Sequence, residues 1–491
     1  MPRSTRALGL VTTLALALPA ATAALASGPA HAEEAAKATT APFRLWAPPS
    51  VTAYAYRNKT WTDLGLRVIA ENGPFELWSH RPSYDDQIET TWRSADGDVA
   101  LPTGAMTDFS GFKDFVTITV TPKKGTAVTM NPKVCFSSYV SERVEPDAPA
   151  TSPYPTGCYF NAFSLGSVQG VQEGWATSIM NQDRPLKIGK GTYDVTATVT
   201  PAYASLFGLS ADEATVSTTL KVKGEQWVGE GRRAARHASG TARPAAHRPT
   251  GAVTKADEVD GPQPDLQSFP AWGISLSKSK KYLRFSATVW NAGDSPLVVD
   301  GFRNQDDQDL MDAYQYFFDA DGNQVGYTPV GHMHWDADPS HNHWHFEDFA
   351  RYSLLNSDLS QAVVSKKDAF CLANTDAADL TVTGAAWKPE NMDLATSCGD
   401  YSSLSIREVL ASGWGDTYTQ YRAGQSLRVD NLPNGTYYVA VDANPDGNLV
   451  ESDTTNNQSL RKIKLSGKGD KRKVTVKQVG IIEDENYGGT G

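Results

Sequence analysis

The sequence of 491 residues is poor in cysteine, has no excess of positive charge and contains no long apolar run after its N-terminal leader. Four cysteines are too few for a disulfide-dense scaffold of this length. Lys and Arg number 45 against 56 Asp and Glu, and the resulting net charge of −11 argues against a nucleic-acid-binding protein. No later stretch reaches about eighteen apolar residues, so the sequence predicts no transmembrane segment.

The N-terminus has the features of a secretory signal peptide. Arg3 and Arg6 precede a short apolar run, and Ala30-His31-Ala32 fits a cleavage site between small residues. We therefore expect residues 1–32 to be removed and the mature protein to be secreted and extracellular. Thiols oxidise outside the cell, so the four cysteines are expected to form two disulfides.

Helical periodicity is also scarce. Only two short segments, residues 403–414 and 209–215, look helical. Elsewhere β-branched and aromatic residues alternate or cluster in short runs such as FVTITVTP and TYDVTATVTP, and Pro, Gly, Asn and Asp separate these runs. The pattern predicts a mainly β fold made of β-sandwich-like domains.

Two parts of the chain share one ordered pattern. Each has two cysteines, then Gly-Trp, then eleven residues with Gly, Thr, Tyr, Val and Pro in register, at 191–201 and 435–445. The repeat predicts a degenerate duplication, with an N-terminal domain at 40–224 and a second domain at 262–491. An Arg/Ala/Pro-rich segment, 225–261, is expected to be a flexible linker. Chance reuse of similar turns and strands is the alternative.

Four cysteines allow three pairings. If each half holds its own bridge, Cys135 pairs with Cys158 and Cys371 pairs with Cys398, and the repeated pattern favours this arrangement.

Histidine is the residue whose distribution is least even. Five of the nine histidines fall within fourteen residues: His332, His334, His341, His343 and His345. The last three alternate, so an extended strand would point them to one face. Their outer Cα atoms would then be about 13 Å apart, and a single ion reaches all three only if the strand bends. Three imidazoles suit Cu(II) or Zn(II), with Cu(II) bound more tightly. A solvated histidine-rich loop is the alternative.

Neighbouring residues have possible supporting roles. We expect His332 and His334 to be structural or to support the ligands without binding the metal. By alternation Glu347 lies on the ligand face, as does Arg351, and Glu347 could orient a ligand or accept a proton. The alternative for Glu347 is a solvated strand carboxylate.

Several ordered motifs of the second half resemble the lysyl oxidase family. HNHWHFEDFARYSLL resembles the copper-binding segment of that family. KKDAFCLANTD resembles its Lys-x-x-Phe-Cys-Leu motif, and GWGDTYTQYR its Asp-Thr-Tyr motif. Further likeness in NPDGNLVESDTTNN and in QPDLQ extends the resemblance over roughly 262–465. The chain is identified as a secreted bacterial member of this family.

The resemblance implies a cofactor and a reaction. It places the copper(2+) ligands on His341, His343 and His345. It also places a lysine tyrosylquinone, formed by crosslinking, on Lys367 and Tyr418. The implied activity converts primary amines or peptidyl lysines to aldehydes with O₂, releasing ammonia and hydrogen peroxide. The quinone would supply the difficult chemistry and the protein would position it.

The sequence also departs from the family pattern. Arg351 stands where the family has a further histidine, so the role of catalytic base is vacant or passes to Glu347 or Asp348. The first half has no His-x-His-x-His, and Ile179 lies near the position that matches Tyr418. We therefore expect the first half to be non-catalytic.

Two further interpretations stay open at the level of sequence. Asp446, Asn448 and Glu451 could bind calcium, or they could belong to a strand-turn-strand whose side chains bond the backbone. The histidines alone also fit a secreted copper-binding protein without enzymatic activity, or a cell-envelope binding module with a structural metal. Lys367 and Tyr418 discriminate these functions from the amine oxidase.

Overall fold

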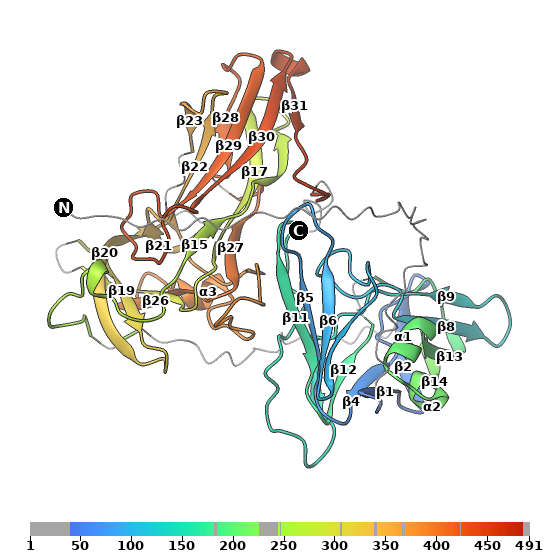
Figure 1. Cartoon of the computed structure of the whole chain (residues 1–491). Coiled ribbons are helices and arrows are strands. Elements are labelled where there is room, and N and C mark those ends of the chain that lie inside the picture. The colour runs from blue at the N-terminus through green and yellow to red at the C-terminus, as the bar shows by residue number, and fades with distance from the viewer. Residues whose placement is uncertain are drawn as a thin grey trace, which may run out of the picture. The chain divides into compact units, whose positions relative to one another are not determined.

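The regular structure of the described chain is mainly antiparallel β-strand, as the sequence predicts (Figure 1). The computed structural model describes residues 40–484 apart from 181–183, 225–243, 246, 305–306, 338–340, 366, 368 and 423. The predicted signal peptide therefore lies outside the described residues. Among the described residues the helices are short, and the longest, α1 (Pro201–Leu206), has six residues. Within the described ranges no helix is long and apolar enough to cross a membrane.

The first half contains three sheets. Their strand orders are β1-β4-β12-β10, β11-β5-β6-β7 and β3-β2-β14-β13-β8-β9. The bounds are β1 Phe43–Trp46, β2 Ser50–Tyr56, β3 Lys59–Thr60, β4 Arg67–Ala70, β5 Phe75–His80, β6 Glu89–Ser94, β7 Gly97–Ala100, β8 Val116–Pro122, β9 Val128–Met130, β10 Glu142–Arg143, β11 Gly166–Val171, β12 Trp175–Ser178, β13 Gly191–Val199 and β14 Thr215–Lys223.

The second half also contains three sheets. Their main orders are β15-β17-β27-β25, β24-β21-β20-β19-β18-β26 and β23-β22-β29-β30-β31, with β16 and β28 also paired to β17. The bounds are β15 Leu266–Ser268, β16 Trp272–Leu276, β17 Tyr282–Asn291, β18 Leu297–Arg303, β19 Leu310–Phe318, β20 Gln324–Asp336, β21 His343–Glu347, β22 Ala350–Leu355, β23 Gln361–Val364, β24 Ala369–Phe370, β25 Asp376–Ala377, β26 Ser405–Leu410, β27 Trp414–Tyr418, β28 Ser426–Arg428, β29 Gly435–Ala443, β30 Gln458–Ser466 and β31 Lys473–Val476. Short helical turns are η1 Ala256–Glu258, α3 Leu394–Ser397 and η2 Gly469–Lys471.

The order of strand pairing is similar in the two halves. β1-β4-β12-β10 corresponds to β15-β17-β27-β25, and β11-β5-β6-β7 corresponds to β26-β18-β19-β20. β9-β8-β13-β14 likewise corresponds to β23-β22-β29-β30, although β2 then joins β14 in parallel whereas β31 joins β30 antiparallel. A duplication would produce this correspondence, and common ancestry of the halves stays a prediction.

Each half has its own apolar core. One cluster draws its buried side chains from strands of the first half, with Phe43, Phe75 and Phe136 among them. A second cluster is built from the second half and includes Trp344 and Phe370. Some strands, such as β5 and β8, alternate buried and partly exposed residues, as expected for a sheet that buries one face, whereas β11 and β18 are buried almost throughout.

Most of the predicted linker lies outside the described residues, so its flexibility stays a prediction. Its last part is described and contacts the second half. Arg248 forms an ion pair with Asp312 and donates to the carbonyl oxygen of Arg303.

Of the two predicted helical segments, one is confirmed and one is wrong. Residues 209–215 contain α2 (Ala211–Ala214), whose first turn is capped by Ser210 and Glu213 in a capping box. Residues 403–414 are instead the strand β26 and the start of β27. β26 pairs with β18 along its whole length, and this pairing with a distant strand overrides the local helical pattern.

Both predicted disulfides are present. Cys135 is bonded to Cys158 and Cys371 to Cys398, so each half holds one bridge.

Candidate functional site

The clustered histidines lie on two paired strands. In the antiparallel pair β20–β21, His334 is opposite His345 and Asp336 is opposite His343. Residues directly opposite each other share a face of the sheet, so this pairing gathers imidazoles and carboxylates on one side. Glu347, two residues after His345, continues the same row, as alternation predicts.

The chain turns just before the strand, where the sequence predicted a bend within it. β21 begins only at His343, and the preceding Asn342 has a φ of 53°, a left-handed conformation that asparagine tolerates better than most residues. This turn brings the His341 ring back beside the others. The ring centroid of His341 lies 5.8 Å from that of His343 and 5.1 Å from that of His345.

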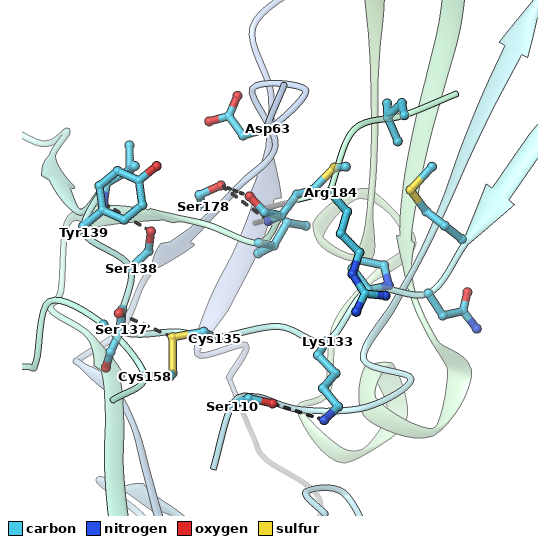
Figure 2. A pocket seen from close by; sticks show the side chains of 18 of the residues that line it. Asp63, Ser110, Lys133, Cys135, Ser137, Ser138, Tyr139, Cys158, Ser178 and Arg184 are labelled. Atoms are coloured by element: carbon cyan, nitrogen blue, oxygen red, sulfur yellow. Dashed lines mark hydrogen bonds between the residues drawn. A yellow bond between two sulfur atoms is a disulfide. The ribbon is translucent and has the colours of Figure 1, made fainter. Parts of the chain in front are cut away.

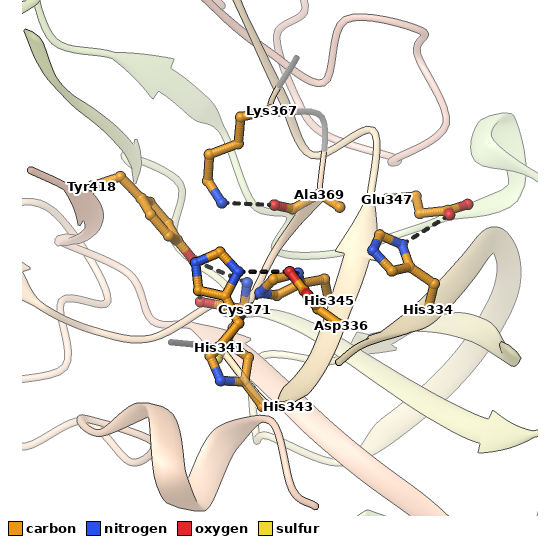
Figure 3. A network of polar contacts seen from close by, with 10 residues as sticks. All are labelled: His334, Asp336, His341, His343, His345, Glu347, Lys367, Ala369, Cys371 and Tyr418. Atoms are coloured by element: carbon orange, nitrogen blue, oxygen red, sulfur yellow. Dashed lines mark hydrogen bonds and ion pairs between the residues drawn. The ribbon is translucent and has the colours of Figure 1, made fainter. Parts of the chain in front are cut away.

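Nitrogen atoms of the three rings face one another or Asp336. The Nε2 atoms of His343 and His345 are 2.9 Å apart. Such a separation suits two neighbouring ligands of one ion at roughly 2.0–2.1 Å. Asp336 Oδ2 lies 2.6 Å from His341 Nδ1 and 3.5 Å from His345 Nδ1, so a single carboxylate contacts two of the rings (Figure 3).

Burial favours the neutral form of two of these imidazoles. Burial is the main cause that lowers the pKa of His343, and it lowers the pKa of His345 to about 2. A neutral imidazole has the lone pair that a metal ion needs. Asp336, His341 and His345 also form a group of three metal-ligating side chains whose donor atoms lie within 4.8 Å of one another. The donor set therefore fits a copper or zinc ion.

The other residues predicted to neighbour the cluster differ in how close they lie to it. His334 Nδ1 is 3.0 Å from Glu347 Oε1, and the His334 ring lies 5.7 Å from the His345 ring. Both residues therefore lie beside the cluster (Figure 3). His332 lies farther along β20, with its Nε2 4.0 Å from Asp312.

Arg351 does not continue the ligand row, so the sequence expectation for it is wrong. Asp348 has a φ of 56°, and this turn ends β21 before β22 begins in another sheet. Arg351 instead forms an ion pair with Asp446, 2.7 Å away. The alternation rule failed because it assumed one unbroken strand.

Lys367 and Tyr418 lie together, close to the histidines. Lys367 is 8% exposed, and its Nζ is 4.4 Å from the centroid of the Tyr418 ring. The same Nζ donates to the Ala369 carbonyl at 3.0 Å. Figure 3 shows the amine and the phenol on the same side of the histidine cluster.

Backbone contacts fix both partners. The Tyr418 hydroxyl donates to the Cys371 carbonyl at 2.8 Å and accepts from the Cys371 N–H at 2.9 Å. On the other side, the stem of Lys367 packs against Gly424. Gly424 has a φ of 82°, and a Cβ at that position would lie 2.9 Å from the Lys367 Cβ. The positive φ and the lack of space for a Cβ both require glycine at this position.

Three carboxyl groups nearby, two of them buried and one partly buried, were not predicted from the sequence. Asp416, Glu408 and Asp376 lie on β27, β26 and β25. Burial raises the pKa of Asp416 and of Glu408 well above the ordinary range and that of Asp376 to about 6. The Asp-Thr-Tyr motif contains Asp416, but only its burial marks it as unusual.

The residues considered for calcium serve as internal contacts. Glu451 accepts hydrogen bonds from the Asn444 and Asn457 amides and from the Leu266 N–H. Asp446 pairs with Arg351. These contacts fit the strand-turn-strand interpretation, and we do not propose a calcium site.

The first half has a cavity where its strand order corresponds to this site. It measures about 830 Å³ and is lined by the Cys135–Cys158 bridge, Ile179 and Asn131 (Figure 2). Within the described residues, the first half contains no group of three metal-ligating side chains. Its lack of catalytic activity stays a prediction.

The second half is similar in sequence to known proteins. Residues 322–477 match the model of the lysyl oxidase family. Lysyl oxidase homolog 4 of Mus musculus is 26% identical over 139 residues, which are 28% of this chain and 16% of that protein. Lysyl oxidase homolog 2A of Danio rerio is 27% identical over 139 residues, or 28% of this chain and 17% of that protein. The chain thus spans less than a fifth of the relatives it matches. The matched residues contain the histidine cluster, Lys367 and Tyr418, and they form a lysyl oxidase family segment within this chain.

Proposed function

We propose that this protein is a secreted amine oxidase that depends on copper and on a quinone made from its own side chains. It would convert a primary amine or a peptidyl lysine, with O₂ and water, to an aldehyde, ammonia and hydrogen peroxide. The observation that supports this most directly is the Lys367 amine, buried 4.4 Å from the Tyr418 ring centroid. Burial of a lysine cation lowers the stability of the fold. A role for Lys367 in a crosslink to Tyr418 would explain why it lies there.

His341, His343 and His345 are the residues that would hold copper, with Asp336 behind them. A carboxylate that contacts the second nitrogen of a ligating imidazole fixes the orientation of the ring and increases its basicity. Asp336 is placed for this role through His341 and His345. When bound, the copper ion would supply the oxidation of the phenol by O₂.

The surrounding residues hold the two reactive groups in a fixed position relative to each other. Cys371 anchors the Tyr418 hydroxyl through both of its backbone polar groups, and Gly424 leaves room for the stem of Lys367. Phe370 packs edge-on against Tyr418, with ring centroids 5.2 Å apart, and shields the pair from water. Reacting groups held this way need little further ordering.

Glu347 is not placed beside the phenol by any described contact. Its carboxylate engages His334, so we assign it an orienting role at the edge of the metal site rather than that of catalytic base.

The decisive experiment is peptide mass mapping after exposure of the full chain to Cu(II) and air. Peptides that contain Lys367 and Tyr418 should be crosslinked and should absorb visible light as a quinone. Tyr418→Phe should abolish the crosslink, the absorbance and amine-dependent peroxide release. Tyr421→Phe is the matched control, because Tyr421 lies three residues away with 65% of its surface exposed.

Unmodified, separate peptides from fully copper-loaded protein would contradict the oxidase. That outcome would leave a copper-binding protein without enzymatic activity as the remaining function of the histidine cluster.

A further inference from the structure

Asp416 is the least satisfied charged group in the region of Lys367. The side chain is 3% exposed, and neither carboxylate oxygen accepts a hydrogen bond of normal geometry, although the Ala373 N–H lies close enough to lower the pKa of the group. A buried carboxylate without such partners is destabilising, because water that would solvate the charge is excluded. Packing alone does not explain why a carboxyl group lies at this buried position.

The strand places Asp416 on the side of the quinone residues. Asp416 and Tyr418 are two residues apart on β27 and therefore point to the same face. Tyr418 meets the Lys367 amine on that face. Burial is the main cause that raises the pKa of Asp416, and Asp376 raises it further, whereas the Lys367 ammonium lowers it. The Lys367 ammonium has no such effect on Asp376 or Glu408.

Other titratable groups surround the pair on several strands. Those that act electrostatically on Lys367 or Asp416 are His343 and His345 of β21, Tyr352 of β22, Asp376 of β25, Glu408 of β26 and Tyr418 of β27. Of the other carboxyl groups among them, neither Asp376 nor Glu408 has a pKa that the Lys367 ammonium lowers, so neither replaces Asp416 as its partner.

Addition of Lys367 to an oxidised ring requires a free amine. An ordinary lysine is only about one part in 2,500 amine at pH 7. We propose that Asp416 takes the ammonium proton of Lys367, so that the reactive amine forms inside the site without release of a proton to solvent. An N–H bond breaks with its electron pair left on nitrogen, an O–H bond forms on Asp416, and two buried charges disappear together.

This proposal rests on the proposed function, and it predicts a particular pH dependence. In the wild type, the pair keeps its single proton whether the lysine is charged or neutral. Formation of the amine is therefore independent of pH while one proton is shared. In Asp416→Asn the same step releases a proton to solvent, so below the lysine pKa crosslinking should rise about tenfold per pH unit.

The measurement uses the full chain, loaded with Cu(II) without oxygen and then exposed to air at several pH values. Quenched samples are digested, and the oxidised Tyr418 peptides that are crosslinked to Lys367 are compared with those that are not. Counting per oxidised Tyr418 removes any effect of pH on copper binding. Asp416→Glu, which keeps a carboxyl group, should retain the flat profile.

Asp376→Asn is the matched control, because it removes another, partly buried carboxyl group nearby without changing how many protons the Lys367–Asp416 pair shares. Its profile should stay flat. A flat profile in Asp416→Asn would overturn the proposal. A tenfold rise per pH unit in the wild type would also overturn it, even if no variant of Asp416 folds. Absence of oxidised Tyr418 in the wild type would instead defeat the proposed function.

Discussion

At the scale of single residues, the reactive groups could be read from the sequence and their partners could not. The alternation of His341, His343 and His345 predicted a shared metal site, and a motif located Lys367 and Tyr418. Asp336 gave no such signal. It joins the cluster because β20 pairs with β21 so that Asp336 faces His343, and this register is set by the sheet.

Replacement of Asp336 tests its role behind the histidines. Asp336→Asn should weaken copper binding by roughly 10- to 100-fold, because the His341 and His345 rings lose the carboxylate that orients them. Competitive titration with a copper chelator of known affinity measures the change. Asp312→Asn is the control, since Asp312 contacts His332 and lies outside the cluster. Equal affinity of wild type and Asp336→Asn would contradict the role.

Titration of Asp376 gives a second test at this scale. Burial raises its pKa in the fold from 3.8 to about 6, so the fold favours the protonated form. The favourable contribution is complete below about pH 4 and is lost as the pH rises through 6. Asp376→Asn should therefore stabilise the protein by roughly 2–3 kcal/mol at pH 7 and by only about 1 kcal/mol at pH 4.5.

Denaturant unfolding at the two pH values measures this difference. Asp358→Asn should behave in the opposite way, because hydrogen bonds from Ser360 lower the pKa of that exposed carboxyl group. If Asp376→Asn raises the free energy of unfolding equally at both pH values, removal of the buried charge is not the cause of the stabilisation.

At the scale of secondary structure elements, the sequence located strands well and their ends poorly. The breaks at Asn342 and Asp348 depend on single left-handed residues, which a pattern of alternating apolar residues does not reveal. β26 was mistaken for a helix because Ile406, Val409 and Leu410 have helical spacing, and its pairing with β18 decided otherwise.

The second disulfide links structure to cofactor formation. Cys371 contacts the Tyr418 hydroxyl directly, and its bridge to Cys398 closes a chain segment with a separation of 27 residues. Cys371→Ser with Cys398→Ser should lower the free energy of unfolding by about 3.5 kcal/mol and also reduce the yield of crosslinked Tyr418. Denaturant unfolding and peptide mass mapping measure the two effects.

The first disulfide provides the matched control. Cys135→Ser with Cys158→Ser removes a bridge of similar separation, 23 residues, and should destabilise the protein by a similar amount. Its crosslink yield in folded protein should equal that of the wild type. Equal losses of yield in both double variants would mean that the bridge acts only through stability.

At the scale of the whole molecule, two halves with corresponding strand order differ in chemistry. The first half has Ile179 and Asn131 along its cavity, whereas the second half has Tyr418 and Lys367 in its site. The repeated motifs predicted this relation in outline. They could not predict the sheets themselves, because strand pairing joins residues that lie far apart in the sequence.

This difference between the halves predicts one tight copper site and one quinone for each chain. The described residues hold a single group of three metal-ligating side chains, and it lies in the second half.

After dialysis against a weak chelator, the full chain should therefore retain one copper ion, measured by elemental analysis against protein concentration. His345→Ala should retain none, because it removes the most buried imidazole of the cluster. His80→Ala, in the first half, should still retain one. Two ions per wild-type chain, with one left in His345→Ala, would show a second copper site elsewhere in the chain and contradict the prediction of one.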